Sequence, residues 1–185
     1  FTYPLSLWAK SGALEREFHY FNKMSEEYNL KFTLITYGDA ADLEYVDNIN
    51  ITVIPMYTIF NKSRYKFITF IQSCIFPFKI YNKLKDIDLI KQNQLYGCWV
   101  AIILKFLIKK PLFIRTGFDA FTFSVKERKK IYKRIGFFIL TQLGLLFSNI
   151  YSVSSKTDYS YISKKYLVNK SKLLYRPNWV LTNPY

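Results

Sequence analysis

A chain of 185 residues with 50% hydrophobic and 22% charged residues is long enough for one domain with a substantial core and too apolar to be disordered. The formal net charge of +14 and the 19% aromatic content suit a surface that faces an anionic membrane or nucleic acid, although such usage is also typical of an AT-rich genome. The two cysteines form no CxxC motif and no Cys/His cluster, so we expect no metal site and reduced, buried thiols in a cytosolic compartment. Because the chain begins with Phe1 rather than Met, we expect a fragment of a longer protein. The start lacks the basic and apolar segments of a signal peptide.

The first half of the chain alternates short apolar runs with amphipathic stretches. Three apolar runs predict strands, at residues 3–8, 31–36 and 51–54. Apolar residues recur at helical spacing over residues 13–28, which predicts a helix with Ser11 as its N-cap. A long helix is predicted over residues 64–84, kinked near Pro77.

Residues 86–119 are predicted to form a strand-helix-strand unit. The strands are the apolar runs at residues 87–90 and 112–114, and the helix between them covers residues 96–108. Polar loops follow both strands: Asn93 and Gln94 come after the first, and Arg115 comes after the second. Because the carboxyl ends of parallel strands meet at one edge of a sheet, where open α/β sheets bind ligands, we expect the functional site there.

The last third continues the alternation, with a helix predicted over residues 124–147, a strand over 150–153, a helix over 157–166 and a strand over 172–175. The whole pattern predicts one three-layer, Rossmann-like α/β domain with a mainly parallel sheet.

The predicted helix over residues 124–147 has two distinct halves. The first half is basic and carries Lys126, Arg128, Lys129, Lys130, Lys133 and Arg134. The second half, IGFFILTQLGLLF, is apolar but shorter than the ~20 residues that span a bilayer. One interpretation is an interfacial helix on an anionic membrane surface. The other is that the apolar half packs on the sheet and the lysines solvate the helix start.

Six segments of the chain resemble motifs of a known family and occur in the same order: SLWAKSGALEREFHYF, FTLITYGDAADLEY, DLIKQNQLYGCWVA, PLFIRTGFD, SVSSKTDYSYISKKY and RPNWV. Together they resemble the N-terminal half of glycosyltransferase family 4 enzymes with the GT-B fold. Residues 1–176 would then be the Rossmann-like acceptor-side domain. Residues 177–185 would begin the linker to a C-terminal donor-binding domain, so we expect this chain to be inactive alone.

The resemblance implies a retaining hexosyltransferase that moves a sugar from a nucleotide-sugar to a glycan or lipid-linked acceptor, as in polysaccharide biosynthesis. No cofactor or metal is implied. In the family, a glutamate pair of the C-terminal domain serves the donor, and this chain holds no such pair. The expected location is cytoplasmic, at the cytoplasmic face of the membrane if the interfacial helix binds there.

The resemblance also assigns site residues. On the donor-phosphate or cleft side they are Gly12, Arg16, Arg115 and Gly117, and on the acceptor side they are Gln94, Tyr96 and Gly97. Two departures stand out. The turn Ser11-Gly12-Ala13 occupies the place of a Gly-Gly pair, and Arg115 stands where many members have a cleft histidine. We expect six of these residues, all except Gly117, to converge on one cleft.

Each assignment has a structural alternative. Gly12 could be a tight-turn glycine, and Asn93 and Gln94 could cap the helix that follows them. Arg115 could pair with Asp119 or Asp39 instead of a ligand.

Other residue types exclude or weaken further chemistries. His19 is the only histidine, and its place on a face of the helix predicted over residues 13–28 favours a structural role over a Ser-His-Asp triad. Asp39, Asp42 and Glu44 could form a metal or acid-base site, but a solvated loop is the expectation. The alternative function is a non-catalytic binding module for an anionic membrane or nucleic acid. Nucleic acid is disfavoured because the aromatic residues are spread through the chain rather than interleaved with basic ones.

Overall fold

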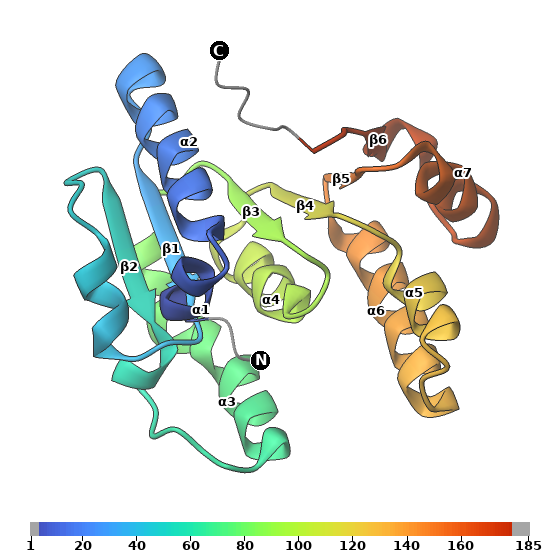
Figure 1. The fold of residues 1–185 in the computed structure, drawn as a ribbon, viewed down its shortest axis with the longest axis horizontal. Coiled ribbons are helices and arrows are strands. Elements are labelled where there is room, and N and C mark those ends of the chain that lie inside the picture. The colour runs from blue at the N-terminus through green and yellow to red at the C-terminus, as the bar shows by residue number, and fades with distance from the viewer. Residues whose placement is uncertain (1–3, 179–185) are drawn as a thin grey trace. The chain divides into compact units, whose positions relative to one another are not determined.

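The computed structural model describes residues 4–178, which divide into unit 1 (residues 4–73) and unit 2 (residues 74–178). Each unit has its own sheet, and every strand pair in both sheets is parallel (Figure 1). The α/β class and the parallel pairing expected from the sequence are confirmed. The single continuous sheet is wrong, because the described strands form one sheet of two strands and one of four.

Unit 1 packs two helices on a two-stranded sheet. Its elements are α1 (Leu5–Lys10), α2 (Ala13–Tyr28), β1 (Phe32–Thr36), the 3-10 helix η1 (Ala40–Tyr45), β2 (Ile51–Pro55) and the 3-10 helix η2 (Met56–Thr58). In the sheet, Phe32 lies opposite Ile51 and Thr36 lies opposite Pro55. Its core forms where Leu5 of α1, Leu14 of α2 and Val53 of β2 meet. The helix α3 (Lys66–Ile80), which contains Pro77, continues from unit 1 into unit 2.

Unit 2 contains a four-stranded sheet in the order β3-β4-β5-β6. After α3, the elements of unit 2 in chain order are η3 (Tyr81–Leu84), β3 (Ile90–Asn93), α4 (Cys98–Ile108), β4 (Leu112–Thr116), α5 (Ala120–Lys126), α6 (Ile131–Phe147), β5 (Ile150–Val153), α7 (Lys156–Lys165), η4 (Lys170–Lys172) and β6 (Leu173–Tyr175). None of the helices in residues 4–178 has the length and apolar character needed to cross a membrane.

The two faces of the unit 2 sheet differ because side chains alternate along each strand. On one face, Ile114 of β4 and Tyr151 of β5 lie in register and are buried. Helix α6 packs closely on this face: a Cβ added at Gly144 would lie 3.2 Å from the Tyr151 ring and 3.4 Å from Ile114. The next residue along each strand, Arg115 and Ser152, belongs to the other face.

Three predicted elements are wrong in detail. Residues 5–8 belong to a helix, not a strand, because a short apolar run fits either structure and here packs as α1; residue 3 lies outside the described residues. Strand β3 starts only at Ile90 and includes Gln92 and Asn93, which were expected in a loop. The helix expected over residues 124–147 is two helices, because the chain turns at Arg128 with a left-handed φ of 49°.

Candidate functional site

Three polar residues form a row across unit 2 near the carboxyl ends of its strands. Asn93 of β3 lies opposite Arg115 of β4, and Arg115 lies opposite Ser152 of β5. Register partners in a parallel sheet point to the same face, so the row places a guanidinium between an amide and a hydroxyl. Ser152 is fully buried, and the other two are half-buried. We call Asn93, Arg115 and Ser152 the polar row.

Two members of the polar row carry buried oxygens without a partner. Within residues 4–178, Asn93 Oδ1 and Ser152 Oγ accept or donate no hydrogen bond. More than about 90% of buried polar groups in folded proteins are paired, so each of these two oxygens calls for an explanation. Groups of this kind are commonly satisfied by a bound water or ligand.

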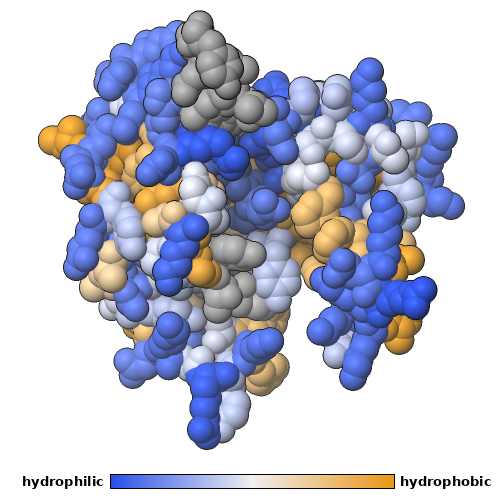
Figure 2. Space-filling view, viewed as in Figure 1, coloured by the Kyte–Doolittle hydropathy of each residue, from blue (hydrophilic) through white to orange (hydrophobic). Residues whose placement is uncertain are grey.

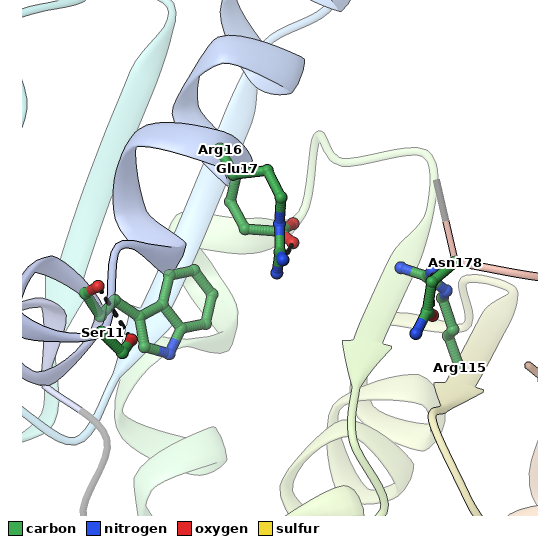
Figure 3. A network of polar contacts seen from close by, with 6 residues as sticks. Ser11, Arg16, Glu17, Arg115 and Asn178 are labelled. Atoms are coloured by element: carbon green, nitrogen blue, oxygen red, sulfur yellow. Dashed lines mark hydrogen bonds and ion pairs between the residues drawn. The ribbon is translucent and has the colours of Figure 1, made fainter. Parts of the chain in front are cut away.

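Arg115 holds a single side-chain hydrogen bond among the described residues. Its Nη2 donates to Asn178 Oδ1 at 2.9 Å, and the two side chains face each other in Figure 3. The only ion pair within residues 4–178 joins Arg16 to Glu17, so the alternative pairing of Arg115 with Asp119 is wrong. The alternative pairing with Asp39, which belongs to unit 1, stays a prediction. A guanidinium has five N–H donors in a planar fork, and most of those of Arg115 remain for a carboxylate or phosphate.

Asp119 is instead part of a buried structural cluster. Its Oδ2 caps α5 by accepting from the Thr122 backbone N–H at 2.7 Å, and its Oδ1 accepts from the Tyr166 hydroxyl at 3.2 Å. Burial and then the Asp119 charge raise the pKa of Tyr166. These bonds fix the segment after β4, on which Gly117 lies.

The loop between β3 and α4 is shaped by two left-handed residues. Gln94 has a φ of 77°, and its backbone N–H donates to the Arg115 carbonyl at 2.8 Å, which ties the loop to the polar row. Gly97, with a φ of 89°, is the N-cap of α4, which has no side-chain cap. The alternative that Asn93 or Gln94 caps this helix is therefore wrong.

Tyr96 projects from the same loop. Its ring is 46% exposed and meets the edge of Trp99 at a centroid distance of 5.6 Å. Partial burial raises the pKa of the Tyr96 hydroxyl, so it stays a neutral donor and acceptor. An exposed aromatic ring with a neutral hydroxyl suits the apolar face and the hydroxyls of a sugar.

Gly117 and the start of α7 complete this edge. The Ser154 hydroxyl donates to the Gly117 carbonyl, and Ser155 caps α7 by accepting from the Asp158 backbone N–H at 3.0 Å. A Cβ added at Gly117 would meet none of the described residues within 4 Å. Packing among these residues therefore does not require a glycine at this position.

Gly12 and Arg16 belong to unit 1. Gly12 is the N-cap of α2 with a left-handed φ of 67°, and the predicted cap Ser11 instead donates its hydroxyl to the Trp8 carbonyl at 3.0 Å. Arg16 pairs with Glu17 at 3.4 Å on the surface (Figure 3), a kind of ion pair that contributes little. The convergence of these two residues with the polar row stays a prediction.

Sequence reasoning misread Asp42. It was expected in a solvated loop, but it is 2% exposed and accepts from the Leu5 backbone N–H at 2.9 Å and from the Thr36 hydroxyl. The Gly38 backbone also passes close to it, since a Cβ at Gly38 would lie 1.9 Å from Asp42 Oδ2. Asp42 is therefore a structural centre of unit 1, joining α1, β1 and η1.

Ser152 and Asn178 were also missed as site residues. The signal for Ser152 is a polar residue inside a buried strand, one register step from Arg115. No signal in the sequence pairs Asn178 with Arg115.

Two features of residues 4–178 concern metal binding and nucleophiles. No group of three or more His, Cys, Asp or Glu residues there could hold a metal ion. Cys98 follows the loop that carries Tyr96, but burial raises the pKa of its thiol to about 12, so it is not a thiolate at neutral pH. Cys98 is buried as expected, whereas Cys74 is only half-buried.

Neither a protein-family model nor a curated protein matches the chain.

Proposed function

We propose that this chain is the acceptor-side half of a retaining glycosyltransferase that uses a nucleotide-sugar donor. The observation that carries the proposal is the polar row: a guanidinium at the carboxyl end of β4, flanked by two buried oxygens without partners in the described chain. The parallel α/β architecture and the six segments that resemble glycosyltransferase family 4 support the same assignment.

The polar row and its loops would serve by positioning and electrostatics. In the transfer, the bond between the sugar carbon and the donor diphosphate breaks, a bond to the acceptor oxygen forms, and the proton of the acceptor hydroxyl passes to the departing diphosphate. Arg115 would bind an anionic group of the donor or acceptor, and Tyr96 and Asn93 would orient sugar hydroxyls. The donor would be held mainly by a domain outside this chain, which is why we expect the chain to be inactive alone.

The proposal can be tested with the full-length protein and a panel of uridine and guanosine diphosphate hexoses. Release of the nucleoside diphosphate, measured with and without mixed glycan or lipid-linked acceptors, reports transfer. We expect release with at least one donor, and a strong loss in Arg115→Ala but not in Lys164→Ala, an exposed basic residue of α7. No release with any donor and acceptor would leave the alternative of a non-catalytic binding module.

A further inference from the structure

The helix pair α5–α6 presents an apolar stripe to solvent. Along α6, exposed apolar side chains recur every three or four residues: Ile131 is 67%, Ile135 51%, Ile139 51%, Leu143 37% and Leu146 51% exposed. The opposite side of α6 is the one that packs on the sheet, where Gly144 and Leu145 are buried. The expectation that this apolar run packs on the sheet is therefore correct for one side of the helix only. We call the exposed residues the apolar stripe.

A basic collar lies at one end of the apolar stripe. Six of the nine residues from 126 to 134 are basic and one, Glu127, is acidic, so the segment carries a net charge of +5. Its basic members are Lys126, Arg128, Lys129, Lys130, Lys133 and Arg134. Figure 2 shows hydrophilic and hydrophobic surface together over the α5–α6 pair at lower right.

The collar is held in place by the turn between the two helices. Arg134 Nε donates to the Lys129 carbonyl at 2.7 Å, and the Lys129 ammonium lies 5.5 Å from the Phe123 ring centre and 5.7 Å from that of Phe137. Phe123 and Val125 of α5 are themselves exposed and extend the apolar surface beside the collar. The turn therefore presents charge and apolar surface together.

We propose that α5–α6 docks this protein on the surface of an anionic lipid bilayer. A helix whose exposed face carries aliphatic side chains beside a cluster of lysines is the arrangement that lies in the membrane interface, with the apolar side chains among the lipid tails and the ammonium groups at the phosphates. The charge decides the lipid class, since a net +5 segment is complementary to an anionic surface. The aliphatic stripe disfavours nucleic acid, because isoleucine side chains offer neither base stacking nor hydrogen bonds.

This inference goes beyond the proposed function and does not rest on it, because vesicle binding needs no sugar transfer. The experiment is flotation of the full-length protein with vesicles of phosphatidylcholine alone or with about one third phosphatidylglycerol. We expect binding to the anionic vesicles only, and weaker binding as salt shortens the range of the charge attraction. Failure to bind anionic vesicles at low salt would overturn the proposal.

Matched variants separate the two parts of the surface. Reversing Lys126, Lys130 and Lys133 to Glu should weaken vesicle affinity about 100-fold or more. The double change Ile135→Ser and Ile139→Ser should remove the binding that persists at high salt. The controls, Lys164→Glu with Lys165→Glu and separately Leu167→Ser, change exposed residues outside α5–α6 and should bind as wild type. Equal losses in the controls would contradict a docking role for α5–α6.

Two further outcomes would assign the surface to another partner. Binding to a mixed-sequence RNA without vesicle binding would make it a nucleic-acid surface. A change from dimer to monomer in the Ile135→Ser and Ile139→Ser variant, measured by sedimentation, would mean that a second copy covers the stripe. Either result would overturn the lipid assignment.

Discussion

Both units have buried polar side chains at or just beyond the carboxyl ends of their strands. The side chains compared below differ in whether other groups of the chain form hydrogen bonds with them. In unit 1, Asp42 is buried and accepts from the Leu5 backbone N–H and the Thr36 hydroxyl. In unit 2, Asn93 Oδ1 and Ser152 Oγ are equally hidden from water but have no partner within residues 4–178. A buried polar group at a strand end is a candidate for contact with a ligand only when the chain itself leaves that group unsatisfied.

The largest effect on stability is expected for Asp42→Ala. The change leaves the Leu5 N–H and the Thr36 hydroxyl buried without an acceptor, so the free energy of unfolding should fall by about 2–4 kcal/mol. Chemical denaturation of wild type and variant measures this. Glu44→Ala, an exposed carboxylate in the same 3-10 helix, is the control and should change stability by less than about 0.5 kcal/mol. Similar values for the two variants would mean that Asp42 is not a structural centre.

A smaller loss is expected for Gly38→Ala. The added methyl group would overlap Asp42 Oδ2, and relieving such overpacking costs about 1–3 kcal/mol. The double variant Gly38→Ala with Asp42→Ala sharpens the test, because removing the carboxylate removes the clash. Its loss should therefore be smaller than the sum of the two single losses. Additive losses would contradict the close approach of these two residues.

The smallest effect is expected for Ser152→Ala in the unliganded protein. Its hydroxyl has no partner to lose, so stability should stay within about 0.5 kcal/mol of wild type or rise slightly. The matched control is Ser124→Ala: this serine is equally buried, but its hydroxyl donates to the Phe121 carbonyl at 2.7 Å. That variant should lose about 1 kcal/mol. A loss at Ser152 equal to that at Ser124 would show that Ser152 has a structural partner.

The alternation of apolar runs predicted most of the fold, for identifiable physical reasons. The helix over residues 13–28 and the strand over residues 150–153 match α2 and β5, since each has a clear period and distinct ends. The turn at Arg128 could not be predicted, because a lysine-rich segment without glycine or proline gives no sign of a helix end. The division into two sheets depends on contacts between distant strands, which no local period encodes.

The candidate site was predictable only in part. Arg115 and Gln94 come directly after or near the end of apolar runs, so the rule that ligands bind at the carboxyl edge was enough to single them out. Asn93 was expected in a polar loop, with capping of the next helix as the alternative, but it lies within β3 and in register with Arg115. Asp42 was expected to be exposed because carboxylates usually are. Its two hydrogen-bond donors lie in other elements, Leu5 in α1 and Thr36 in β1, and no local pattern around Asp42 predicts them.

The central claim is that the polar row binds a ligand and does not stabilise the fold. The most direct measurement compares Arg115→Ala with wild type in the full-length protein, for both the free energy of unfolding and the turnover of the active nucleotide-sugar. Because Arg115 has a single exposed partner, Asn178, we expect a stability change below about 1 kcal/mol. Turnover should fall about 100-fold or more, as when one preorganised donor is lost from an active site. Unchanged turnover, or a loss of turnover explained by unfolding, would contradict the claim.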